Sequence, residues 1–217
     1  MTSEFFHYIL RIPIVLLSLS VHEVAHGYVA YKLGDPTARN LGRLSLNPMK
    51  HFDLFGSLCM LLFGFGWAKP VPISTRYFKN PRSGMAISAL AGPLSNLIMA
   101  FIAFISQAYI FRFGMEAIFS GTNSIVYMLF LFFNEFFFLN ILLAVFNLLP
   151  IPPLDGSKIL FVFLPDKLYF GVMKYEQYIS IALFICLWLG WLDRPITFIT
   201  GAFTMLFSFI TQFLPFL

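Results

Sequence analysis

Two histidines and a glutamate stand close together near the start of the chain, as His22, Glu23 and His26. Residues four positions apart share one face of a helix, so both imidazoles could reach a single metal ion. Zinc lowers the pKa of a water molecule that it binds to about 7, and a neighbouring carboxylate can then take up the proton. The spacing therefore predicts a zinc site with His22 and His26 as ligands and Glu23 as general base.

The surroundings of this motif favour a metal site over a structural role. The chain contains four histidines, and two of them lie in the motif. The motif is part of an apolar segment, and a charged side chain inside a bilayer costs roughly 2–3 kcal/mol or more. A buried histidine with a purely structural role would normally stand alone, without a second histidine four residues away and a glutamate between them.

A catalytic zinc site needs a third protein ligand and an open fourth position. His7 lies fifteen residues before His22, about 22 Å away along a helix, and His51 lies in a basic loop. Asp155 fits better, because it follows a predicted helix that ends in prolines, at a depth similar to that of His26. We therefore predict Asp155 as the third ligand; the alternative is a turn residue in Pro-Leu-Asp-Gly.

The apolar composition determines the kind of fold that can hold this site. The chain is 59% hydrophobic and 11% charged, whereas soluble domains carry about 25% charged residues. A soluble domain of 217 residues could not bury so much apolar surface. The sequence predicts an all-α, multi-pass membrane protein with one domain over residues 1–217. Its scattered basic residues suit a lipid bilayer and not a nucleic acid.

About five apolar segments are long enough to cross a bilayer as helices. The predicted spans are residues 5–33, which carry the two histidines, and 83–111, 124–149, 175–192 and 196–214. Residues 53–73, between the first two spans, are too short and too rich in glycine and proline for a further span. They predict a membrane-associated, re-entrant segment that ends in an extended, β-hairpin-like loop at 67–73.

The basic residues predict which way the helices cross the membrane. Eleven of the fourteen Lys and Arg residues lie between the first two spans or after the third. Short loops rich in Lys and Arg stay in the cytosol. The predicted zinc site then opens toward the cytosol, and we expect the protein in the cell membrane of a prokaryote.

Together, these segments resemble the site-2 protease family of intramembrane metalloproteases. The resemblance rests on His-Glu-Val-Ala-His at 22–26 and on Asn-Leu-Leu-Pro-Ile-Pro-Pro-Leu-Asp-Gly at 147–156. Ala-Gly-Pro-Leu-Ser-Asn at 91–96 and Gly-Trp-Ala-Lys-Pro-Val-Pro at 66–72 also agree with the family in type and order. The similarity covers about residues 15–165. Without an insert of PDZ type or a tail of CBS type, the chain resembles a minimal member.

The resemblance implies a zinc metalloprotease that hydrolyses peptide bonds of membrane proteins within or near the bilayer, at the cytosolic side, in regulated intramembrane proteolysis. It implies zinc bound by His22, His26 and Asp155, with Glu23 activating water and Asn147 helping to hold the scissile carbonyl. The implied partners are a transmembrane substrate, the lipid bilayer, and a regulatory membrane protein or a second copy of the chain. The implied substrate contacts are Asn96, Trp67, Lys69, Pro70 and Val71.

Two other functions fit parts of the pattern: a membrane metal-ion transporter and a non-catalytic membrane scaffold of the same fold. A transporter would carry more ligands and a continuous polar track across the membrane.

Three other polar residues lie within apolar segments. Asn96 could form a hydrogen bond between helices and not contact a substrate, and Asn140 could also form such a bond. Glu135 is a carboxylate within an apolar segment, and the sequence assigns it no role.

Overall fold

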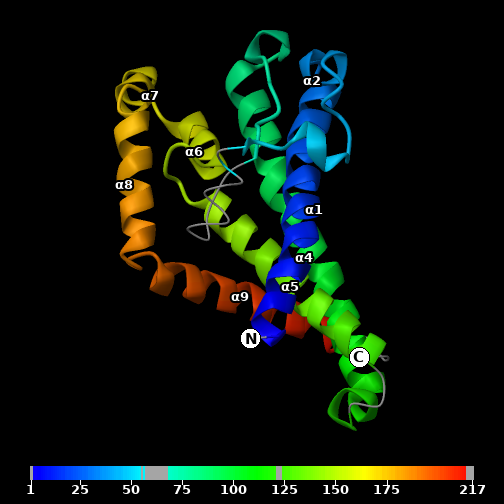
Figure 1. The fold of residues 1–217 in the computed structure, drawn as a ribbon. Helices are drawn as coiled ribbons and strands as arrows, with labels where there is room; N and C mark the ends of the chain where they lie inside the picture. The colour runs from blue at the N-terminus through cyan, green and yellow to red at the C-terminus, as the bar shows by residue number, and fades with distance from the viewer. Residues whose placement is uncertain (1, 55, 57–67, 121–123, 214–217) are drawn as a thin grey trace.

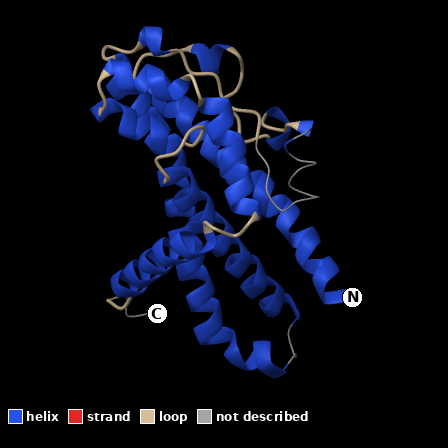
Figure 2. Ribbon diagram, turned by 90° about the vertical axis from the view of Figure 1, so that its left-hand side faces the viewer, coloured by secondary structure: helices blue, strands red, loops and turns tan. Residues whose placement is uncertain are grey.

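The computed structural model describes residues 2–54, 56, 68–120 and 124–213, and every regular element in these residues is helical (Figures 1 and 2). Three long helices form the central bundle: α1 (Thr2–Lys32), α4 (Pro81–Ser120) and α5 (Ser124–Leu148). The remaining elements are α2 (Thr37–Asn40), η1 (Pro48–Lys50), η2 (Thr75–Tyr77), α6 (Asp155–Leu160), η3 (Phe161–Phe163), α7 (Asp166–Met173), α8 (Glu176–Trp188) and α9 (Asp193–Thr211).

Four helices of the described residues are long and apolar enough to cross a membrane. They include residues Ile9–Lys32 of α1, Pro81–Glu116 of α4, Ile125–Leu148 of α5 and Asp193–Thr211 of α9. The prediction of an all-helical membrane protein is therefore confirmed. In Figure 1, α7 and α8 follow one side of the molecule, and α9 crosses toward the bundle near the end where α1 begins.

The fifth predicted span, residues 175–192, is not confirmed. The structure has the 13-residue helix α8 there, which measures about 20 Å, whereas the apolar core of a bilayer is about 30 Å thick. Gly190 ends this helix with a φ of 70°, a conformation that favours glycine. Its N–H donates to Leu187 O and the N–H of Trp191 donates to Cys186 O, which together form a Schellman motif.

The predicted hairpin at 67–73 is also not confirmed, because residues 68–73 pair with no strand in the described part of the chain. The N–H of Lys69 donates to His51 O at 2.8 Å, and the N–H of Val71 donates to Glu23 Oε2 at 2.7 Å. Pro70 and Pro72 have no N–H to donate. The segment is therefore fastened to α1 and to the preceding loop, while residues 55 and 57–67 lie outside the described residues.

A buried aspartate anchors the end of this segment. Asp35, in the turn that follows α1, has no exposed surface. Its carboxylate accepts hydrogen bonds from the N–H and hydroxyl of Thr37 and from the N–H of Ser74, the last at 2.6 Å. Asp35 therefore joins the turn after α1 to the chain that leads into α4.

Helices α1 and α4 face each other through residues that recur every four positions along each helix. Buried residues on α1 recur at this interval and place Ile14 and Ser18 below the two histidines. The facing stripe on α4 is mostly small, and small residues allow two helix backbones to approach each other within a membrane. The stripe consists of Ser88, Gly92, Asn96 and Ala100.

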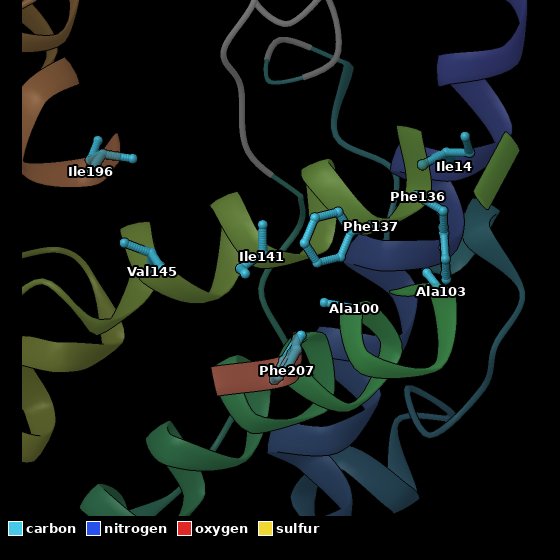
Figure 3. Packing of buried hydrophobic residues seen from close by; sticks show 9 residues of the cluster. All are labelled: Ile14, Ala100, Ala103, Phe136, Phe137, Ile141, Val145, Ile196 and Phe207. Carbon is cyan, nitrogen blue, oxygen red and sulfur yellow. The ribbon is translucent and has the colours of Figure 1, made fainter. Parts of the chain in front are cut away.

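An apolar core lies between helices of the bundle (Figure 3). It joins α1, α4, α5 and α9, and Phe207 of α9 packs against Phe101 and Phe104 of α4. Lipid is as apolar as these side chains, so van der Waals packing holds them together. The core consists of Ile14, Ala100, Ala103, Phe136, Phe137, Ile141, Val145, Ile196 and Phe207.

An ion pair joins α1 and α5 closer to the N-terminal end of the bundle. Arg11 Nε lies 2.8 Å from Glu135 Oε2. This contact gives Glu135 a structural partner, which the sequence alone does not identify, and it aligns two helices that run in the same direction.

Candidate active site

Three buried side chains meet at one point between α1 and the start of α6. The Nε2 atoms of His22 and His26 lie 2.9 Å apart, and Asp155 Oδ2 lies 3.2 Å from the first and 3.1 Å from the second. Bonds of about 2.0–2.2 Å to a tetrahedral zinc ion separate its ligands by about 3.3–3.6 Å. The three atoms therefore fit one zinc ion after moving apart by a few tenths of an ångström.

Each imidazole is held by a hydrogen bond on its other nitrogen. His26 Nδ1 lies 2.7 Å from the backbone oxygen of Ser88, and His22 Nδ1 lies 2.5 Å from Asn96 Oδ1. A carbonyl oxygen can only accept, so Nδ1 of His26 carries a proton, and Nε2 is the nitrogen left to ligate a metal. A neutral imidazole in this tautomer is the form that ligates a metal.

Asp155 reaches the histidines because the chain turns sharply after α5. Asp155 is the first residue of α6. A side chain at Gly156 would clash with the backbone oxygens of Leu148 and Leu149, so only glycine allows α6 to pack this closely against the end of α5. Prolines 150, 152 and 153 end α5 and prevent the helix from continuing.

The two carboxylate oxygens of Asp155 have different partners. Oδ2 faces the histidines, while Oδ1 lies 2.9 Å from the Nζ of Lys158, which is one turn further along α6. Burial by itself raises the pKa of Asp155, but hydrogen bonds with His22 and His26, aided by the charges of His26 and Lys158, hold it well below its usual range. Asp155 is therefore ionised, as a metal ligand must be.

Glu23 lies on the same helix as the two histidines but outside the group of converging ligand atoms. It is half-buried, and its Oε2 accepts the N–H of Val71. This bond orients, through a main-chain donor, the carboxylate of the residue that follows His22 on α1. The position suits a group that exchanges protons with a molecule at the metal site.

The other residues implied to act lie in different surroundings. Asn147 is near the end of α5, and its amide donates to Leu143 O at 2.9 Å. Asn96 is fully buried behind His22, a position that offers no surface to a substrate. In the loop, Lys69 and Pro70 are exposed and Val71 is buried, while Trp67 lies outside the described residues.

Sequence reasoning missed two contributors to the site, Ser88 and Lys158. Ser88 acts through its backbone oxygen, so no side-chain pattern could indicate it. Lys158 lies three residues after Asp155, and that helical spacing was a usable signal once Asp155 was assigned. The interhelical hydrogen bond suggested for Asn140 is present: its Oδ1 accepts from Asn96 Nδ2 and its own Nδ2 donates to Ser18 Oγ.

We expect Gly92→Ala to lower the zinc content of the purified protein severalfold. A Cβ at this position would clash with the imidazole rings of both His26 and His22, so α4 would have to move away from α1. Metal analysis by mass spectrometry measures the loss. Gly201→Ala is the matched control, since a Cβ there meets no atom within 4 Å; equal zinc content in both variants would show that Gly92 is not needed for the site.

Comparison with known proteins places this chain among membrane peptidases. The profile of peptidase family M50 matches residues 114–189. YwhC of Bacillus subtilis, named as a candidate zinc metalloprotease, is 43% identical over 76% of this chain and 73% of its own length. MJ0611 of Methanocaldococcus jannaschii, with the same description, is 34% identical over 68% of this chain and 71% of its own. No solved structure matches the chain significantly.

The chain therefore belongs to peptidase family M50, the site-2 protease family, and the resemblance seen in the sequence is confirmed. A more distant relative, Rip2 of Mycolicibacterium smegmatis, is 31% identical over 69% of this chain and 55% of its own length. The class of enzyme predicted from the sequence, a zinc metalloprotease, is confirmed with the family.

Proposed function

We propose that this protein hydrolyses peptide bonds of membrane proteins within or beside the bilayer, with His22, His26 and Asp155 as zinc ligands and Glu23 as general base. The observation that carries the proposal is the convergence of three buried ligand atoms within 4.8 Å of one another. They meet in a bundle of helices long and apolar enough to span a membrane. The carboxylate of Glu23, the residue after His22, is outside the ligand set and accepts the N–H of Val71.

In the proposed reaction, bound zinc supplies a Lewis acid that acidifies water and polarises the scissile carbonyl. Glu23 takes a proton from the attacking water and passes it to the leaving amide nitrogen. The N–H of Val71 keeps the Glu23 carboxylate in place. Asn147 could donate a hydrogen bond to the developing oxyanion, after releasing the Leu143 oxygen that its amide contacts.

A substrate helix must unwind before cleavage, because its carbonyl groups are otherwise engaged in hydrogen bonds. We propose that the unwound segment binds along residues 68–71, next to Glu23. The contact between Val71 and Glu23 supports this location, as does the exposure of Lys69 and Pro70. Pro70 and Pro72 lack N–H groups, and the N–H groups of Lys69 and Val71 are bonded to His51 O and Glu23 Oε2. Residues 69–72 could therefore pair with a substrate only through carbonyl oxygens.

We further propose that the site opens toward the cytosol of a prokaryotic cell. Basic residues concentrate at the end of the bundle where α1 ends and α4 begins, and cytosolic loops carry this excess. The relatives from Bacillus subtilis and Methanocaldococcus jannaschii support a prokaryotic membrane.

Cysteine labelling of intact cells is expected to leave positions 43 and 167 unlabelled and to label position 122. Position 43 follows α2, position 167 lies at the start of α7, and position 122 lies in the sequence between α4 and α5. The parent protein for this work lacks the two native cysteines, and permeabilised cells serve as the control. Labelling of position 43 from outside would reverse the proposed orientation.

The function is tested by reconstituting the protein with single-span test substrates whose helices contain glycine or proline. Cleavage that a zinc chelator suppresses and added zinc restores is the expected result. Cleavage that continues in the chelator, or in His26→Ala, would overturn the proposed site. Zinc movement into sealed vesicles without any cleavage would favour a transporter instead.

A further inference from the structure

A line of buried polar side chains runs from the metal site into the apolar interior and joins three helices. It begins at His22 of α1, continues through Asn96 of α4 and Asn140 of α5, and returns to Ser18 of α1. Ser18, Asn96 and Asn140 have no exposed surface. Burying polar groups at such depth costs free energy unless they are hydrogen-bonded. Apolar side chains would pack here without that cost, so the presence of these polar residues suggests a role other than packing.

The contacts along this line are short and continuous. Asn96 Oδ1 lies 2.5 Å from His22 Nδ1, and Asn96 Nδ2 donates to Asn140 Oδ1 at 2.8 Å. Asn140 Nδ2 donates to Phe136 O at 2.8 Å and to Ser18 Oγ at 2.9 Å. The two amides thus connect a backbone carbonyl of α5 to a proposed zinc ligand of α1.

The backbone carbonyl fixes the direction of every bond in this line. Phe136 O can only accept, so the amide of Asn140 must turn its NH2 group toward it. Asn140 Oδ1 then faces Asn96 and accepts, which requires the NH2 group of Asn96 on that side. Asn96 Oδ1 is left facing His22, and it can only accept a hydrogen bond from an N–H at Nδ1.

The orientation of two amides therefore decides the tautomer of His22. With the proton on Nδ1, the lone pair of His22 is on Nε2, which is the atom that lies 3.2 Å from Asp155 Oδ2. If Asn96 were reversed, its NH2 group would face Nδ1 and favour the opposite tautomer, with the proton on the atom that must bind the metal. His26 needs no such line, because the Ser88 carbonyl contacts it directly.

We propose that Asn96 and Asn140 are positioning residues that set the tautomer of His22 for metal binding, and that Asn140 acts through Asn96. This replaces the sequence-based assignment of Asn96 to substrate binding. The inference rests on the proposed function only in taking His22 as a zinc ligand. It predicts an effect on zinc affinity that is measurable without any substrate.

The test is the zinc dissociation constant of the purified full-length protein, measured by competition with a chelator. Groups that orient a ligating histidine typically contribute 10- to 100-fold to metal affinity, and we expect Asn96→Leu to lose affinity in that range. Asn140→Leu is expected to lose less, because Asn96 can still adopt the correct orientation part of the time. Asn96→Asp is expected to keep most of the affinity, since a protonated carboxyl offers the same acceptor and donor.

The double variant Asn96→Leu/Asn140→Leu separates a relay from simple packing. If Asn140 acts through Asn96, the double variant binds zinc as weakly as Asn96→Leu and no weaker. Effects that multiply would show that Asn140 acts independently and would overturn the relay. Ser20→Ala is the matched control, because Ser20 is a buried polar residue of α1 whose hydroxyl donates to Leu16 O, away from the line; it is expected to bind zinc normally.

Two further measurements keep the outcomes distinct. Thermal unfolding in the presence of chelator shows whether a variant is folded before its affinity is compared. His22→Ala is measured beside the others: if it retains zinc, the proposed site is wrong. If His22→Ala loses zinc while Asn96→Leu binds it as the wild type does, the site stands and the positioning role of Asn96 is wrong.

Discussion

Glu23→Gln is expected to reduce the rate of peptide cleavage by roughly 100- to 10,000-fold, the range that a positioned acid–base group contributes. The amide has nearly the same shape as the carboxylate, and its oxygen can still accept the N–H of Val71, which lies 2.7 Å from Glu23 Oε2. It cannot take a proton from water. Single-turnover cleavage of one substrate isolates the chemical step from slow substrate entry.

Zinc content must be measured on the same preparation of Glu23→Gln. Because Glu23 is outside the converging ligand atoms, one zinc ion per chain should remain. Cleavage at the wild-type rate would remove Glu23 from the role of general base. Loss of zinc would instead indicate that the carboxylate belongs to the ligand set.

Asp155→Ala is expected to lower zinc occupancy at least tenfold and to abolish cleavage with it. The substitution removes one of three protein ligands and leaves the two histidine Nε2 atoms, 2.9 Å apart, without a shared anion. Metal analysis after dialysis against a weak chelator gives the occupancy.

Lys158→Gln is the matched control for Asp155→Ala. It removes the charge that lies 2.9 Å from Asp155 Oδ1 but leaves Oδ2 facing the histidines. Its zinc content is expected to fall far less than that of Asp155→Ala. Full zinc occupancy in Asp155→Ala would show that the third ligand is another residue.

The convergence of His22, His26 and Asp155 could be predicted from the sequence because its signals are local or compositional. The spacing of His22 and His26 fixes their shared face on any helix, and the apolar composition places that helix in a membrane. Asp155 could be inferred because the prolines before it end α5, and an intramembrane site needs a third ligand at matching depth. Among the described residues, the group of histidine, cysteine and acidic side chains that could hold a metal ion consists of these three residues.

The features that the sequence did not predict depend on how distant segments pack. The length of α8 is set by the Schellman motif at Gly190, whereas the apolar run continues beyond it. The loop at 68–73 is shaped by donors that reach His51 and Glu23, not by strand pairing. For Asn96 and Asn140 the sequence suggests hydrogen bonds between helices but not their partners, which depend on how α1, α4 and α5 are aligned.

Hydrolysis at the site formed by His22, His26 and Asp155 leaves a specific mark on the product. When the reconstituted protein cleaves a single-span substrate in water enriched in oxygen-18, mass spectrometry should find one heavy oxygen atom in the new terminal carboxyl group. The same fragment should be absent when Glu23→Gln or zinc-depleted protein is used. A fragment cut at the same bond, at the same rate, by Glu23→Gln or by zinc-depleted protein would contradict peptide hydrolysis at this site.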